Sequence, residues 1–200
     1  MFLRNHAYTK ARLKQIIEIA TFYRVRWHLP PGNFHKFLIT FDDGPCPNTL
    51  QILPILRKYR IKGIFFMVAE RMLQYPDIVR QVISDGHTIA SHGLRHVVMK
   101  NLNLKDFRLQ VLQSFAIIRK FAGNQPKWFR PPQGLITPLQ LAWLVSSGFE
   151  VVFWSHQLGG NENLMEVSPK INKLGAIILL HDFDETHTIE PIIESCNMSG

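Results

Sequence analysis

Short apolar runs alternate with segments of helical period through most of the chain. Runs such as FLITF at 37–41 and GIFFMV at 63–68 are uniformly apolar, whereas the stretches between such runs place apolar residues at helical spacing. Strands that are apolar on both faces are typical of parallel sheets covered by helices. The pattern predicts an α/β fold whose parallel sheet is open or closed into a barrel. The six expected strands span 37–41, 63–68, 87–91, 127–130, 149–154 and 175–180.

Helices are expected between these strands, and two of them carry clear end signals. Thr137 is the predicted N-cap of one helix, and Gly123 closes another. The expected helices span 47–60, 75–86, 104–123, 137–148 and a segment around 189–194.

A further helix is expected at 8–23, where basic residues lie between apolar ones. We interpret residues 1–30 as a helical extension that covers one end of a single domain formed by residues 31–200. The alternative for this helix is weak contact with an anionic membrane surface.

Charge and composition narrow the function classes only a little. The chain has 23 basic and 15 acidic residues, a net charge of +8, which favours acidic partners or an anionic surface. The basic residues are scattered without interleaved aromatic residues, so nucleic-acid binding is not expected. Cys46 and Cys196 lie far apart, which argues against a disulfide framework or a thiolate zinc site. No signal peptide or membrane-spanning run is recognised, and a cytoplasmic location is therefore expected.

Polar residues, most of them titratable, follow several of the expected strands. Because ligands of parallel α/β folds gather at the carboxyl ends of the strands, these residues are expected to share one rim. They are Asp42, Asp43, Ser91, His92, His96, Arg130, His181 and Asp182.

Two features of this set indicate a metal site. An aspartate pair at the end of a buried strand is costly unless a cation or a proton-transfer task offsets the cost, although one aspartate could instead cap the next helix. His92 and His96 are four residues apart, which on a helical turn places both rings on one face. Together with Asp43 they form a two-histidine, one-carboxylate set that leaves positions open for water and substrate. The alternative is a chance histidine pair on a solvated helix.

The motifs in combination resemble the polysaccharide deacetylases of carbohydrate esterase family 4, over about residues 37–194. That family has a distorted, incomplete β/α barrel with parallel strands, and it uses a divalent metal, usually zinc, to remove acetyl groups from N-acetylated sugars; cobalt is the alternative ion. The motifs are TFDDGP at 40–45, GIFFMVAE at 63–70, GHTIASHGLRH at 86–96, RPPQG at 130–134 and GAIILLHD at 175–182.

The resemblance implies a role for each site residue. It makes Asp42 the general base, Arg130 the partner of Asp42, and His181 the general acid. It also implies that Asp43, His92 and His96 bind the metal. Gln133, through a backbone N–H, Pro132 and Trp154 are expected to border the N-acetylated carbohydrate substrate, with a core position as the alternative for Trp154.

The chain departs from the family pattern at three places. Gly93 stands where a serine or threonine usually braces the metal loop, so that loop is expected to gain freedom. The segment 154–161 lacks the usual aspartate that orients the acidic histidine; His156, Gln157, Asp182 or Asp184 are candidate substitutes. The usual further strand and helix after 189–194 are not recognised, so an exposed edge strand and a homodimer are expected.

These departures keep other functions open. A catalytically weak or inactive relative that binds metal and carbohydrate is the main alternative, and a hydrolase of cyclic amides is another.

Overall fold

Eight strands lie side by side in one sheet, and all neighbouring strands are parallel. The computed structural model describes residues 2–32, 37–158, 175–184 and 186–197 of the chain. The strand order is β1-β6-β5-β4-β3-β2-β8-β7. The strands are β1 (Val25–Arg26), β2 (Phe37–Asp42), β3 (Ile64–Met67), β4 (Thr88–Ser91), β5 (Trp128–Phe129), β6 (Glu150–Val152), β7 (His156–Gln157) and β8 (Ala176–His181).

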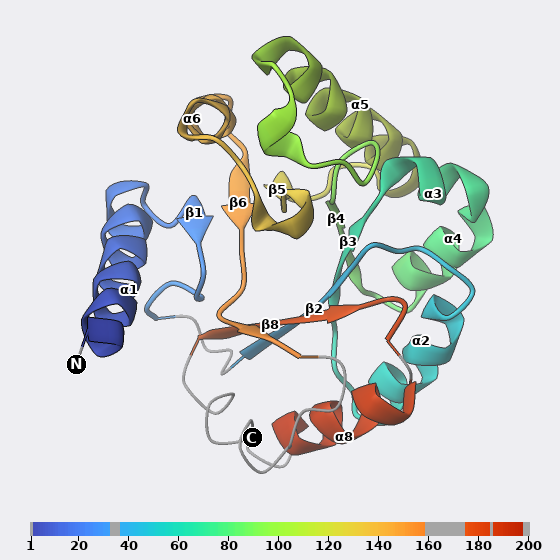
Figure 1. Cartoon of the computed structure of the whole chain (residues 1–200). Helices are drawn as coiled ribbons and strands as arrows, with labels where there is room; N and C mark the ends of the chain where they lie inside the picture. Colours follow the sequence, from blue (N-terminus) through green and yellow to red (C-terminus); the bar gives the residue numbers. More distant parts are fainter. Residues whose placement is uncertain (1, 33–36, 159–174, 185, 198–200) are drawn as a thin grey trace.

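Helices surround the curled sheet on its outer side (Figure 1). None of the helices in the described part of the chain is long and apolar enough to cross a membrane. The α-helices are α1 (Phe2–Ala20), α2 (Thr49–Lys58), α3 (Ala69–Gln74), α4 (Pro76–Ser84), α5 (Leu104–Ala122), α6 (Pro138–Ser146) and α8 (Thr186–Asn197), and the short 3-10 helices are η1 (Met99–Asn101) and η2 (Pro132–Gly134).

The predicted parallel barrel with an incomplete ring is confirmed. β6 and β7 are separated by residues 153–155 only, so this part of the chain pairs first with β1 and β5 and then with β8. In the described segments, the outermost strands β1 and β7 are not paired with each other. A single antiparallel bridge joins His28, which follows β1, to Ala176 at the start of β8. This bridge connects the two sides of the ring where it is open.

The last predicted strand, β8, is not an edge of the sheet. β8 has β2 on one side and β7 on the other, because the chain after β6 bends across the sheet and adds the short strand β7. In the described segments the edge strands are β1 and β7. The homodimer stays a prediction. The cytoplasmic location also stays a prediction.

Side chains of the strands alternate between two packed environments. Ile39, Phe41 and Phe65 pack outward against the helices in the largest core cluster, whereas Ile64 and Phe66 belong to a smaller cluster inside the ring. Burial on both faces explains why these strands read as uniformly apolar. By the same alternation, Thr40 and Asp42 are set on the opposite face of β2 from Ile39 and Phe41, and both are buried.

The helix ends follow their predicted signals. Thr137 caps α6 with a full capping box, in which its side chain accepts from the Gln140 N–H and the Gln140 side chain accepts from the Thr137 N–H. Gly123 ends α5 with φ of 63°, a conformation that glycine adopts readily. The short helix α3 and the two-residue strands β1 and β7 were not predicted from the sequence.

His87 is a buried structural residue between β3 and β4. The backbone N–H of Gly63 donates to its Nδ1 atom at 3.1 Å, so this nitrogen must carry a lone pair. The ring also packs against Phe65, with 5.4 Å between ring centroids. Burial lowers the pKa of His87 to about 4, and the nearby charge of Lys62 adds to this effect.

We expect the free energy of unfolding to fall as the pH falls from about 6.5 towards about 4. In that window the unfolded chain protonates His87 while the folded chain keeps it neutral, so protons favour unfolding. In His87→Asn, whose amide oxygen can accept from Gly63, this pH dependence should be weaker. Urea denaturation over a pH series measures it. Gln51→Asn, at an exposed residue of α2 that does not titrate, is the control and should keep the wild-type slope; an unchanged slope in His87→Asn would contradict the assignment.

Candidate active site

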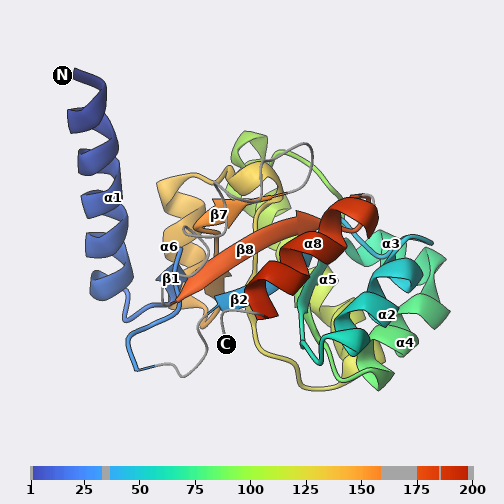
Figure 2. The ribbon, with the colours of Figure 1, turned by 90° about the horizontal axis from the view of Figure 1, so that it is seen from below.

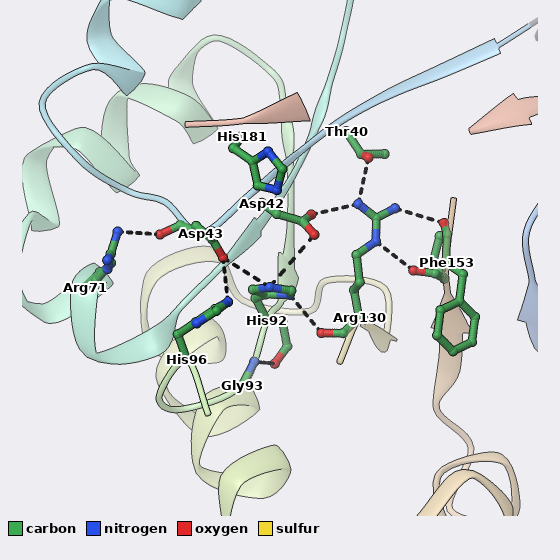
Figure 3. A network of polar contacts seen from close by, with 12 residues as sticks. Thr40, Asp42, Asp43, Arg71, His92, Gly93, His96, Arg130, Phe153 and His181 are labelled. Carbon is green, nitrogen blue, oxygen red and sulfur yellow. Dashed lines mark hydrogen bonds and ion pairs between the residues drawn. The ribbon is translucent and has the colours of Figure 1, made fainter. Parts of the chain in front are cut away.

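The ends of β2, β4, β5 and β8 bring the predicted residues to one end of the barrel (Figure 3). Asp42, the last residue of β2, is the register partner of His181, the last residue of β8. His92 directly follows β4, and Arg130 directly follows β5. The strand-end rule therefore placed residues from four separate strands correctly.

Arg130 is fully buried, and its guanidinium makes four hydrogen bonds, one of them to Asp42. Its Nη1 atom lies 2.7 Å from Asp42 Oδ1 and donates to Thr40 Oγ1 at 2.8 Å. Its Nε and Nη2 atoms donate to the backbone oxygens of Val152 and Phe153 at 2.8 and 3.0 Å. Burial lowers the pKa of Arg130 and the Asp42 carboxylate opposes that change. Arginine remains charged in proteins, so the pair is an ion pair in a dry environment.

Asp42 and Asp43 point in different directions because the backbone turns between them. Asp43 has φ of 72°, a left-handed conformation that ends the strand. Gly44 then passes so close to Asp182 that a Cβ atom would overlap its carboxylate. The glycine of the DDGP motif is therefore required by a close approach of two segments, and the aspartate pair is split between two tasks.

Asp43, His92 and His96 form a compact cluster of three ligand atoms. Asp43 Oδ1 lies 3.2 Å from His92 Nε2 and 3.1 Å from His96 Nε2, and all three atoms lie within 4.8 Å of one another. The expectation that a helical turn pairs the histidines was wrong. Residues 92–98 form a loop rather than a helix, since Gly93 takes φ of +93°.

The hydrogen bonds of His92 show that this cluster fits a cation. His92 Nδ1 lies 2.9 Å from the backbone oxygen of Arg130, which can only accept, so Nδ1 carries the proton. In the neutral ring the Nε2 lone pair then faces Asp43 Oδ1, which is buried and has no hydrogen-bond donor of its own. Two acceptors 3.2 Å apart require a positive charge between or upon them, either protons on the histidines or a bound metal ion. A nitrogen–nitrogen–oxygen set of this kind suits zinc.

The environment of Asp43 also favours its charged form. Burial works to raise the pKa of Asp43, but the hydrogen bond to His92 and the charges of the neighbouring histidines outweigh it, so the pKa lies below its ordinary value. The Arg71 Nη1 atom donates to the backbone oxygen of Asp43 at 2.8 Å.

The metal loop is not freed by Gly93, contrary to expectation. The Gly93 N–H donates to Ser91 Oγ at 3.1 Å, and its carbonyl accepts from the N–H of Ala69 at the start of α3. A Cβ atom at position 93 would come within 2.6 Å of Met99. Ser91 therefore supplies a brace from two positions earlier, and the left-handed backbone with φ of +93° favours glycine at position 93.

His181 has a carboxylate partner in Asp184. His181 Nδ1 lies 3.7 Å from Asp184 Oδ2, and the backbone N–H of His181 donates to the same oxygen at 2.7 Å. Asp184 raises the pKa of His181 above its ordinary value, burial opposes this, and the charges of Asp42 and Asp43 add to the rise. Among the candidate substitutes for the missing aspartate, Asp184 is the one that contacts His181; residues 159–161 of the divergent segment lie outside the described residues.

Asp182 has a structural position instead. It is fully buried, its carboxylate accepts a hydrogen bond from Thr49 Oγ1, and its backbone oxygen accepts from the Asn48 side chain at 2.8 Å. Burial raises the pKa of Asp182 to about 7. These contacts tie the loop after Asp43 to the end of β8.

Gln133 and Trp154 border a groove beside the site, while Pro132 is buried beneath it. The groove has a volume of about 370 Å³, and Gln133 adopts φ of 58° at its edge. The groove is lined by Lys14, Trp27, Gln133, Gly134, Ile136, Leu141, Phe153 and Trp154.

Two site residues were not recognised in the sequence. Thr40 is fully buried, donates to the Ile178 backbone oxygen at 2.7 Å and accepts from Arg130; its only signal was a hydroxyl within an apolar run. Arg71 supports Asp43 from α3, and its guanidinium lies 4.6 Å from the ring centre of Phe183. No spacing in the sequence pointed to Arg71.

Comparison with known proteins places this arrangement in context. Residues 30–152 match the family model described as polysaccharide deacetylase. A peptidoglycan-N-acetylglucosamine deacetylase of Bacillus cereus is 34% identical over 166 residues, which cover 79% of this chain and 77% of that protein. Another protein of that name from the same organism is 35% identical over 126 residues, and the chain spans only 46% of its length.

Solved structures share the fold. The crystal structure of a peptidoglycan N-acetylglucosamine deacetylase named Bc1960 superposes with a TM-score of 0.76 at 25% identity, covering 91% of this chain and 88% of that one. A pseudoenzyme of the CE4 family from Bacillus anthracis has a TM-score of 0.77 at 20% identity, covering 88% and 65%. At that identity the likeness shows the fold alone, and this fold is found in a protein described as a pseudoenzyme.

We expect Asp43→Asn to weaken zinc binding by at least about 100-fold. Losing a residue that merely supports a metal ligand costs about 10- to 100-fold in affinity, so losing a ligand should cost no less. Titration calorimetry of the metal-free chain with zinc measures this. Asp106→Asn, at an exposed carboxylate of α5, should bind zinc as the wild type does. Equal zinc affinity in wild type and Asp43→Asn would rule out this cluster as the metal site.

Proposed function

Since the chain belongs to the polysaccharide deacetylase family, we propose that it is a metal-dependent hydrolase that removes N-acetyl groups from an N-acetylated amino sugar in an oligosaccharide, polysaccharide or glycolipid. The observation that carries the proposal is the cluster of Asp43, His92 and His96 next to an aspartate held by a buried arginine. Asp43, His92 and His96 would hold the ion, with zinc expected and cobalt as a replacement. When bound, such an ion lowers the pKa of a water molecule and polarises a carbonyl.

Asp42 is suited to the role of general base. Its Oδ1 is held by Arg130, whereas its Oδ2 lies 3.8 Å from His92 Nε2 and faces the metal cluster. The ion pair with Arg130 limits the rotation of the carboxylate. Asp42 can therefore accept a proton from water while remaining fixed in position.

His181 is suited to protonate the departing amine. It stands at the register position beside Asp42, and its side chain is partly exposed at the mouth of the site. Because Asp184 raises its pKa, a larger fraction of His181 carries a proton near neutral pH. The proposed base, Asp42, and the proposed acid, His181, thus come from adjacent strands and have different environments. Different environments allow one group to accept a proton while the other donates one.

The relatives and the groove support a proposal for the substrate class. The relatives are named for N-acetylglucosamine in peptidoglycan, and the groove beside Gln133 has aromatic walls at Trp27, Phe153 and Trp154. Aromatic surfaces with a few polar groups are common in sugar sites. We therefore propose glycans that contain N-acetylglucosamine as substrates, with a Gln133 backbone N–H as a contact for the acetyl oxygen.

A catalytically weak or inactive protein that binds metal and carbohydrate is the second candidate. It is favoured by the lack of a carboxylate at residues 154–158 and by the presence of a pseudoenzyme among proteins of this fold. The contact between His181 and Asp184 favours the active enzyme instead.

We expect Asp42→Asn to lower kcat for acetate release by at least about 100-fold, because a positioned general base contributes about 10² to 10⁴-fold. Acetate release from chitooligosaccharides and from peptidoglycan, in the presence of zinc or cobalt, is the measurement. Zinc binding should persist in this variant.

Asp77→Asn is the matched control, since Asp77 is an exposed carboxylate on α4, and its rate should equal that of the wild type. Undetectable acetate release by wild type, together with zinc-dependent sugar binding in calorimetry, would favour the inactive relative.

We expect Asp184→Asn to shift the alkaline limb of the kcat/KM profile to lower pH. The general acid must be protonated, so the rate falls as the pH rises through its pKa, and removing the Asp184 charge lowers that pKa. The acidic limb, which reports the base, should move little. Asp182→Asn is the comparison, because that residue contacts Thr49 and the loop rather than the His181 ring. An unchanged alkaline limb in Asp184→Asn would exclude Asp184 as the partner.

A further inference from the structure

The positive charge of the chain is concentrated in its first 36 residues. This segment has seven lysine and arginine residues and a single carboxylate, Glu18, so it holds +6 of the net charge of +8. The remaining 164 residues are therefore close to neutral, with 16 basic and 14 acidic side chains. The net positive charge that favours an anionic partner therefore lies mostly in α1 and in the segment that follows it.

Helix α1 presents an apolar stripe to solvent instead of to the domain. Leu13, Ile16 and Ile19 repeat every three residues and are 56%, 56% and 58% exposed. At 3.6 residues per turn they occupy about a third of the helix circumference. Phe22, just beyond the helix, is 90% exposed and extends the stripe. Figure 2 shows α1 standing at one side of the molecule, away from the helices that cover the sheet.

The opposite side of α1 fixes the orientation of this stripe. Glu18 is 5% exposed, and its Oε1 atom accepts hydrogen bonds from the backbone N–H groups of Trp27 and His28 at 2.6 and 2.9 Å. Ile17 packs against the cluster that contains Val25 and Phe153. Since the helix is fastened along this side, Leu13, Ile16 and Ile19 are held outward.

The only carboxylate of the segment is therefore withdrawn from the surface. Lys10 and Arg12 are exposed on the helix, and Arg24 is exposed shortly after it. Arg12 lies on the same side of the helix as the apolar stripe, where its long stem can cover apolar surface while its charge stays in water. The outer face of α1 consequently combines apolar side chains with cations and exposes no anion.

We propose that the outer face of α1, formed by Leu13, Ile16, Ile19 and Phe22 with Arg12 and flanked by Lys10 and Arg24, docks on the surface of a bilayer that contains anionic phospholipids. An amphipathic helix with basic residues binds in the plane of such a surface, with its apolar side chains among the head groups. The lipid phosphates complement the cations, and the bilayer interior covers the apolar stripe.

Charge decides between a bilayer and a second copy of the chain. Pairing two α1 stripes would bring two sets of cations together with no exposed carboxylate on either helix to neutralise them. An anionic lipid surface provides the opposite charge to every cation of the face. The complementarity therefore assigns the face to lipid.

Docking would also set the position of the groove. The inner side of α1 contributes Lys14 to the groove that continues to Gln133 and Trp154. A bilayer under the outer face of α1 would hold that groove close to the membrane surface, where the glycan part of a membrane-linked molecule lies. This consequence depends on the proposed function, whereas the docking itself does not.

Flotation of the full-length chain with lipid vesicles tests the proposal. We expect binding to vesicles of equal parts phosphatidylcholine and phosphatidylglycerol, little binding to phosphatidylcholine alone, and a decline as salt screens the charges. Ile16→Asp should reduce binding at least tenfold. The double variant Lys10→Gln/Arg12→Gln should reduce it by about 30-fold, at about fivefold for each charge, and should show a weaker salt dependence.

Matched controls separate this face from the rest of the surface. Leu73→Asp, at a leucine of α3 that is 57% exposed, and Lys105→Gln/Lys120→Gln on α5 should bind like the wild type. Thermal unfolding should be alike in all variants; if Ile16→Asp does not fold, the double variant at Lys10 and Arg12 still decides.

Three results would overturn the proposal. They are no binding of wild type to the anionic vesicles, equal binding to both vesicle types, and equal binding by wild type and the α1 variants. A dimer in sedimentation velocity that Ile16→Asp dissociates, without vesicle binding, would assign the face to a second copy. None of these outcomes bears on acetate release from a soluble chitooligosaccharide, which tests the proposed function separately.

Discussion

The buried ion pair between Arg130 and Asp42 is the interaction on which the site depends. A fully buried guanidinium is costly, and here the cost is offset by four hydrogen bonds to groups on β2 and on the chain at and just after the end of β6, together with the Phe66 ring 4.0 Å away. Removing either charge from such a pair typically destabilises a protein by about 3–5 kcal/mol, because the other charge is left unpaired. The barrel interior is therefore organised around a charge whose only anionic partner among the described residues is Asp42.

This arrangement separates the two aspartates by function. Asp42 is held inside by Arg130, and the left-handed backbone at Asp43 turns the next carboxylate toward His92 and His96. His92 links the two halves, because its Nδ1 is bound to the backbone oxygen of Arg130 while its Nε2 faces Asp43. Arg130 thus holds Asp42 through its side chain and His92 through its backbone oxygen, so the positions of these two residues are linked.

Much of the fold and the site was predictable because it depends on burial and on strand direction. Uniformly apolar runs identified β2, β3, β4 and β8, and the carboxyl ends of parallel strands gave the list that includes Asp42, His92, Arg130 and His181. The rest depends on contacts that no local pattern records. Two-residue strands such as β7 are too short for a period, so β7 was not predicted. The loop shape at Gly93 and the support from Arg71 follow from packing of α3, a short helix that was not predicted.

The position of Asp184 determines what its carboxylate can do for His181. Asp184 lies on the same turn, and its shortest contact is with the His181 backbone N–H at 2.7 Å rather than with the ring nitrogen at 3.7 Å. A carboxylate at the longer distance still raises the pKa of the imidazole through its charge. It restrains the ring less than a hydrogen bond of ordinary length would, because hydrogen bonds to nitrogen donors rarely exceed about 3.2 Å. Asp184 therefore acts on the protonation of His181 more than on the orientation of its ring.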